Sequence, residues 1–180
     1  SMWAQCPHRW KTAYIDGHRE FSDNIHTLFG TSMHEVIQTF LTVMYNDTAK
    51  MAEALPLEDM LLTRMKRNFE SVLETNGGEM FCTEKDMVEF YQHGVEILKF
   101  IRKKRAQYFS KKGYELIGIE VPLNYDLPNN VKFVGYIDIV IRDTVRDVIK
   151  IYDIKTSTMG WNKWMKADKN KTDQLLLYKQ

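Results

Sequence analysis

Cysteine is scarce in this chain of 180 residues, and the two that occur, Cys6 and Cys82, are far apart and form no CxxC pair. A disulfide framework and a zinc ribbon are therefore unsupported, and both side chains are interpreted as reduced thiols. The sequence also lacks a GxxxxGK[ST] loop, which argues against an ATPase. The segment HEVIQ at 34–38 lacks the second histidine of HExxH, which argues against a zinc protease.

Long apolar runs and a large net charge are missing as well. No stretch approaches the roughly 20 apolar residues that span a bilayer, and no charged-then-apolar leader opens the chain, so we expect a cytoplasmic protein without a membrane partner. The formal net charge is only +1, which by itself gives no argument for a nucleic-acid partner. Basic residues are nevertheless concentrated at 99–112 and 155–180. For each run, a solvated helix face and a phosphate-binding surface are the two alternatives.

The first half of the chain has the pattern of helices. Apolar residues recur at helical spacing over 30–46, where Ser32 and Glu35 match an S-x-x-E capping box, so a helix is predicted to begin near Ser32. Two further helices are predicted over about 57–74 and about 83–110, each followed by glycine.

The second half has the pattern of a sheet. Segments rich in β-branched and aromatic residues occur at 115–125, 131–143 and 147–157. The connections between them are too short for crossover helices, so an antiparallel meander is expected. A last helix, capped by Thr172, is expected after the sheet.

This order predicts an α+β fold in one domain over 1–180. The helical part covers about 1–112, and the sheet with the last helix covers about 113–180. Because the sequence stops inside that last helix, we expect the natural polypeptide to continue.

Charged residues inside the predicted strands mark the candidate site. Asp138 lies between isoleucines, and a buried carboxylate is costly unless it is paired or holds a metal. Asp153 and Lys155 are two residues apart, so on a neighbouring strand they would share one face. Two carboxylates and a lysine suit a magnesium or manganese ion with an activated water, a constellation that hydrolyses phosphodiesters. An ion network among the same three side chains is the alternative.

Two helices contribute further candidates. His34 is in line with Ile37 and Leu41 on its helix, which points it toward the flank of the buried face, where an imidazole would complete a metal shell. Gln174 and Tyr178 are spaced i, i+4 and share a helix face that suits gripping a nucleotide. Taken singly, each of these residues would be unremarkable.

Together these residues resemble a nuclease pattern. The RecB-type branch of the PD-(D/E)XK nucleases has four motifs that this chain matches in order: His34, Gly135-x-x-Asp138, Asp153-x-Lys155-Thr156 and Gln174-x-x-x-Tyr178. That branch includes nuclease domains of recombination helicase-nucleases, CRISPR-adaptation exonucleases and phage exonucleases. The resemblance extends over 6–180 and implies a restriction-endonuclease-like core.

The resemblance also implies roles for the matching residues. Asp138 and Asp153 would be metal ligands together with His34 and the Ile154 backbone carbonyl, and Lys155 would serve the water nucleophile. Glu120 matches a position that is frequently acidic in the family, and would be an outer-shell or second-metal ligand. The DNA-contacting residues would be Thr156, Lys163, Lys166, Gln174 and Tyr178.

The implied activity is that of a magnesium- or manganese-dependent DNA exonuclease. Its substrate would be DNA with a free end and single-stranded character, and a helicase or recombination partner is expected. The segment at 3–14 resembles one whose cysteine joins three downstream cysteines around a [4Fe-4S] cluster in some relatives, but this chain lacks those three, so no cluster is expected. A non-cleaving DNA-end-binding module and a structure-specific endonuclease are the alternatives.

Overall fold

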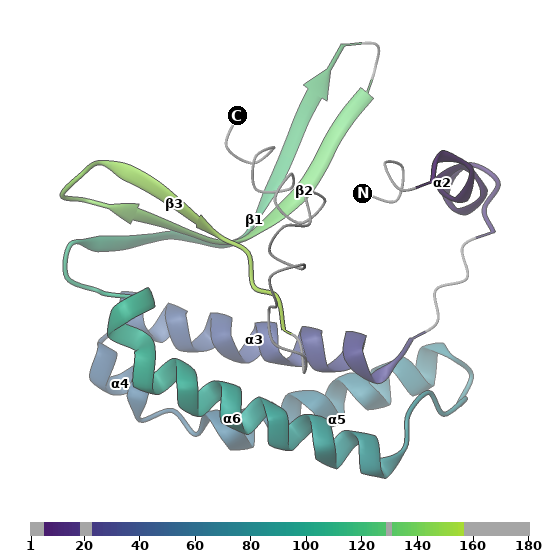
Figure 1. Cartoon of the computed structure of the whole chain (residues 1–180), viewed down its shortest axis with the longest axis horizontal. Helices are drawn as coiled ribbons and strands as arrows, with labels where there is room; N and C mark the ends of the chain where they lie inside the picture. The colour runs from purple at the N-terminus through teal and green to yellow at the C-terminus, as the bar shows by residue number, and fades with distance from the viewer. Residues whose placement is uncertain (1–5, 19–22, 129–130, 157–180) are drawn as a thin grey trace.

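The computed structural model describes residues 6–18, 23–128 and 131–156. In this part of the chain, three long helices form a layer beneath a bent antiparallel sheet (Figure 1). The helices are α2 (Pro7–Tyr14), α3 (Ile25–Asn46), α4 (Ala49–Glu53), α5 (Leu57–Thr75) and α6 (Glu84–Tyr108). The strands are β1 (Tyr114–Leu127), β2 (Val131–Asp143) and β3 (Val148–Tyr152).

The hydrophobic core lies around α3. Its buried apolar side chains run along the whole helix and pack against α5, α6 and β2, which contributes Ile139 and Ile141. Gly94 marks the tightest approach, because a Cβ atom there would lie 2.4 Å from Leu61 Cδ2 and 3.1 Å from Phe29 Cε2. The core therefore fixes α3 against both its helical neighbours and the sheet.

The predicted start of α3 is wrong. The helix begins at Ile25, seven residues before Ser32, and Asn24 caps it by accepting a hydrogen bond from a backbone N–H of the first turn. Ser32 is fully buried in the helix interior, where its hydroxyl donates to the Leu28 carbonyl (2.8 Å) and accepts from Asn68 Nδ2 (3.0 Å). The serine packs in the helix interior, and the cap lies more than two helical turns earlier than the S-x-x-E match indicated. The predicted limits of α5 and α6 agree with the structure to within two residues.

The strands form an antiparallel meander in the order β1-β2-β3, which confirms the predicted α+β fold with a helical first half. The third strand is shorter than predicted and ends at Tyr152. Beyond it, the Ile154 N–H donates to the Asp138 carboxylate (2.6 Å). Asp153 and Lys155 consequently lie after β3 rather than within it.

The β1–β2 hairpin is bent near its middle. Figure 1 shows that one arm of the hairpin pairs with β3, while the other arm rises away from the helices. The β1–β2 register shifts between Leu116 and Gly118, and Glu120 has a left-handed backbone with φ +50°. Such irregularities bend a strand and redirect a side chain. Here they occur where the hairpin passes α3.

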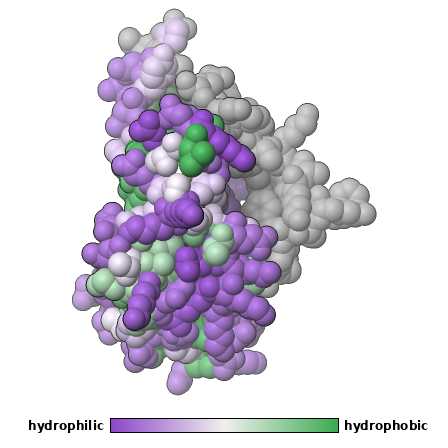
Figure 2. All heavy atoms as spheres, turned by 90° about the vertical axis from the view of Figure 1, so that its left-hand side faces the viewer, coloured by the Kyte–Doolittle hydropathy of each residue, from purple (hydrophilic) through white to green (hydrophobic). Residues whose placement is uncertain are grey.

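Other surfaces carry less information about the site. Figure 2 shows the end of the molecule at the left of Figure 1, where hydrophilic residues predominate and hydrophobic areas are small and separate. Among the described residues, none of the helices has the length and apolarity needed to cross a membrane. The predicted last helix lies outside the described residues.

Candidate metal centre

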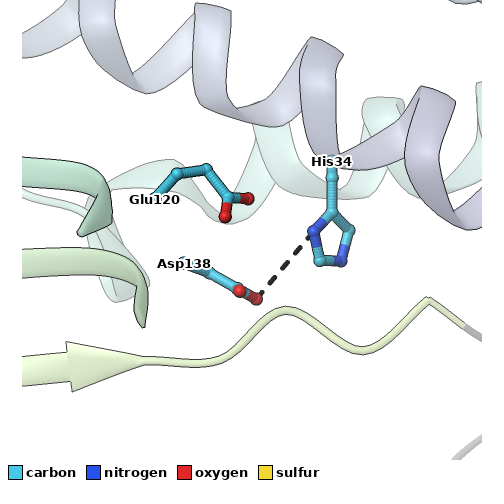
Figure 3. Close-up of side chains that lie close together, drawn as sticks. All are labelled: His34, Glu120 and Asp138. Atoms are coloured by element: carbon cyan, nitrogen blue, oxygen red, sulfur yellow. Dashed lines mark ion pairs between the residues drawn. The ribbon is translucent and has the colours of Figure 1, made fainter. Parts of the chain in front are cut away.

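His34, Glu120 and Asp138 converge on one point. Each offers a ligand atom, one imidazole nitrogen and two carboxylate oxygens, and these three atoms all lie within 4.8 Å of one another. Figure 3 shows the side chains approaching from three different elements: His34 from α3, Glu120 from β1 and Asp138 from β2. Residues separated by up to 104 positions in the sequence are thus brought to one small region.

Asp138 is the least exposed of these charged groups. Its side chain is 13% exposed, and its Oδ2 atom accepts the Ile154 N–H at 2.6 Å. Burial raises the pKa of the Asp138 carboxyl, and the negative charges of Asp153 and Glu120 raise it further, while the Ile154 N–H and His34 act in the opposite direction. A site that crowds carboxylates in this way favours a bound cation.

His34 is oriented by the segment that follows β3. Its Nε2 atom lies 2.7 Å from the Ile154 carbonyl oxygen, and its Nδ1 atom lies 3.9 Å from Asp138 Oδ2. When Nε2 carries the proton and donates to the carbonyl, the Nδ1 lone pair faces the carboxylates. A histidine that is hydrogen-bonded through one nitrogen and open at the other is the usual arrangement of a metal ligand. Two of the predicted ligands, His34 and the Ile154 carbonyl, therefore contact each other.

Glu120 lies between Ile119 and Val121, which pair with Ile139 and Ile137, the two neighbours of Asp138 on β2. Its Oε1 atom accepts a hydrogen bond from Gln38 Nε2 at 2.6 Å, and its side chain is otherwise exposed. Gln38 follows His34 by four residues, so both side chains project from the same face of α3. Sequence reasoning missed Gln38, although its i, i+4 spacing from the histidine was a usable signal.

Asp153 and Lys155 form an ion pair beside this group. Lys155 Nζ lies 2.8 Å from Asp153 Oδ1, and the Asp153 side chain is only 11% exposed. Asp153 follows Tyr152, which is the last residue of β3 and the partner of Ile139, so it lies next to the segment of β2 that carries Asp138. Asp153 is not among the three residues with ligand atoms within 4.8 Å, but its charge acts on Asp138.

The other predicted site residues fall into two groups. Thr156 lies against α3, because a Cβ atom at Gly30 would be 3.5 Å from its hydroxyl oxygen. The second group lies outside the described residues: Lys163, Lys166, Gln174 and Tyr178.

The basic run at 99–112 lies mainly on the C-terminal half of α6. Three of its side chains are paired with carboxylates: Arg102 with Glu58 of α5, Arg105 with Glu53 of α4, and Lys99 with Glu96 within α6. These pairs favour the solvated helix face over the phosphate-binding surface.

Comparisons with known proteins agree with the geometry. Residues 2–180 match the PD-(D/E)XK nuclease superfamily. Searches of curated proteins and of solved structures gave no match. A helical first half followed by a three-stranded antiparallel sheet is consistent with the restriction-endonuclease-like fold of that superfamily. The chain therefore belongs to the PD-(D/E)XK nuclease superfamily, which identifies it as a metal-dependent nuclease of DNA.

Proposed function

We propose that this nuclease is a magnesium- or manganese-dependent exonuclease of the RecB-type branch, acting on DNA with a free end. The observation that carries the proposal is the convergence of His34, Glu120 and Asp138 from three elements, in a chain that matches the superfamily. The four motifs in family order support the RecB-type branch. That branch is also the basis for proposing a helicase or recombination partner and a cytoplasmic location.

The donor set fits a small, hard divalent cation. Carboxylate oxygens are the ligands that Mg²⁺ prefers, and one imidazole beside them is compatible with Mn²⁺. The environment of Asp138 points the same way, because a cation there would offset both the burial and the repulsion by Asp153 and Glu120 that raise the Asp138 pKa. We infer that Asp138, Glu120 and His34 would hold the ion, with Asp153 as a further ligand.

The residues of the chain then have distinct roles in hydrolysis. A divalent cation held there supplies Lewis acidity toward the phosphoryl oxygen and lowers the pKa of a bound water. The Ile154 N–H fixes Oδ2 of Asp138, and the Ile154 carbonyl fixes the His34 ring. Lys155, which is 44% exposed, places an ammonium group beside Asp153, where it can orient the water and stabilise the negative charge that develops on the phosphate.

The test uses end-labelled linear DNA and circular DNA, each with Mg²⁺, Mn²⁺ or EDTA. Cleavage of the linear substrate alone, abolished by EDTA and strongly reduced in Asp138→Asn and Lys155→Ala, is the expected result. Asp147→Asn is the matched control, because Asp147 is a carboxylate in a surface ion pair with Arg142 and should be dispensable. Cutting of circles would replace the exonuclease by an endonuclease. Tight DNA binding without metal-stimulated cleavage would contradict the nuclease assignment.

A further inference from the structure

Exposed apolar side chains lie on β2 immediately before the metal centre. Tyr136 is 58% exposed and Val134 is 61% exposed. They precede Asp138 by two and four residues, and side chains at this spacing project from the same face of a strand. The Tyr136 ring is thus about 6.6 Å along the strand from the Asp138 position, twice the rise per residue.

This face of β2 is exposed before Asp138 and buried after it. Farther along the same face of β2, on the other side of Asp138, Val140 is buried to 8% exposure. Figure 1 shows that the arm before the centre rises away from the helices. The core therefore does not account for an aromatic and a branched apolar residue at these positions. Exposed apolar side chains that continue into a site are a usual mark of a binding surface.

We propose that Tyr136, with Val134 beside it, stacks against an unpaired nucleobase of the DNA strand whose phosphate enters the metal centre. This inference rests on the proposed function and adds the residue that would bind an unpaired base of the substrate. Aromatic side chains bind successive bases by stacking, and they do so with little regard to sequence because every base has a π-face. In a duplex the faces of internal bases are covered by their neighbours, so the surface selects strands that are open.

A basic residue extends the same face. Lys132 lies two residues before Val134, and its Nζ atom is 3.9 Å from the exposed Asp126 carboxylate. An ion pair that is long and exposed contributes little, so the ammonium group is available to a backbone phosphate. The face thus carries, in order, a cation for the backbone, an apolar surface for a base and the carboxylate of the metal centre.

The hairpin also supplies a matched control. Tyr125 is 67% exposed, and its cross-strand partner is Phe133, three residues from Tyr136 along β2. An odd separation along a strand places side chains on opposite faces, so Tyr125 is a tyrosine of similar exposure on the other side of the same arm.

The experiment measures binding of fluorescein-labelled oligothymidylate by anisotropy, with Ca²⁺ replacing Mg²⁺ and with intact substrate verified on a gel. Tyr136→Ala should weaken binding by about 5- to 100-fold, the range expected for loss of one base-aromatic stack. Tyr136→Phe and Tyr136→Trp should bind close to wild type, because they keep an aromatic face, and Tyr125→Ala should also be unchanged. An abasic nucleotide is then moved along the oligonucleotide. At one position it should remove the difference between wild type and Tyr136→Ala.

Three results would overturn the stacking proposal: unchanged binding by Tyr136→Ala, equal losses for Tyr136→Ala and Tyr125→Ala, or a loss that persists on every abasic strand. These outcomes are separate from failure of the proposed function. Tyr136-dependent binding without metal-stimulated cleavage would leave the stack and remove the nuclease assignment. Cleavage together with normal binding by Tyr136→Ala would do the reverse.

Discussion

Two substitutions of Glu120 can separate the energetic cost of its left-handed backbone from the contribution of its carboxylate. Glu120 has φ +50° in the middle of β1, and its side chain accepts a hydrogen bond from Gln38. Glycine and alanine at this position both remove the carboxylate and the hydrogen bond. They differ in their tolerance of the left-handed backbone, so a comparison between the two variants isolates that cost.

The expected difference favours glycine. A residue other than glycine in the left-handed region costs about 1–2 kcal/mol, and glycine in a strand costs about 0.5–1 kcal/mol through the entropy of the unfolded chain. Glu120→Gly should therefore be more stable than Glu120→Ala by about 0.5–1 kcal/mol. For a chain of this size, each kcal/mol changes Tm by about 2–4 °C. Both variants should lose metal-dependent cleavage to a similar degree.

The assay is urea unfolding of the metal-free variants in EDTA, paired with cleavage of linear DNA in Mn²⁺. Glu115 is the control, because it is an exposed glutamate on the same strand and is not among the positive-φ residues. There the order should reverse, with alanine more stable than glycine by about 0.5–1 kcal/mol. If alanine were also the more stable residue at position 120, Glu120 would not have a left-handed backbone and the reasoning would be refuted.

Three further predictions concern other residues. Asp143 is 3% exposed and accepts hydrogen bonds of 3.0 and 3.2 Å from backbone N–H groups of the 144–147 turn, which lower the pKa of its carboxyl below 3.8. Its stabilising effect is present above that value and lost as the pH falls through the folded pKa, so Asp143→Ala should be less stable than wild type in urea at pH 7, by an amount that shrinks as the pH falls below 3.8. A difference independent of pH would contradict this origin. Gly94→Ala should lower the urea midpoint. A methyl group 2.4 Å from Leu61 Cδ2 costs about 1–3 kcal/mol, more than the gain of about 1 kcal/mol in helix propensity. An unchanged midpoint would show that α5 and α6 can move apart to accommodate the methyl group without loss of stability. Gln38→Ala should keep the wild-type urea midpoint and raise the Mn²⁺ concentration needed for half-maximal cleavage, because Glu120 loses the donor that positions it; an unchanged Mn²⁺ requirement would exclude this role.

Much of the fold followed from periodicity and turn chemistry. The limits of α5 and α6 were predicted because glycine follows each helical segment, and both agree with the structure. The start of α3 was predicted wrongly, because a serine followed three residues later by glutamate can form a cap only where the preceding residues are not helical. Leu28 and Phe29, both buried, continue the apolar stripe upstream of Ser32 and were the signal that the helix began earlier.

The site was predictable in kind and less so in detail. An aspartate between buried isoleucines required a partner, and Asp138 does lie among charged groups. The proximity of Glu120 was not predictable from strand alternation, because a shifted register and a left-handed residue redirect its side chain. Nor could periodicity show that β3 ends at Tyr152, since the Ile154 N–H bonds to a side chain rather than to a neighbouring strand.

Two features of the metal centre oppose folding. Because burial raises the Asp138 pKa, the unfolded chain releases this proton at lower pH than the folded chain, and the metal-free fold loses stability as the pH rises through that interval. The left-handed backbone of Glu120 adds a second cost at the same place. A cation that binds only the folded chain offsets such costs, by about 2.7 kcal/mol at a hundred times its Kd. Local sequence preferences reflect what stabilises each element in isolation. They therefore predict the structure least well where metal ligands are brought together at a cost in folding stability.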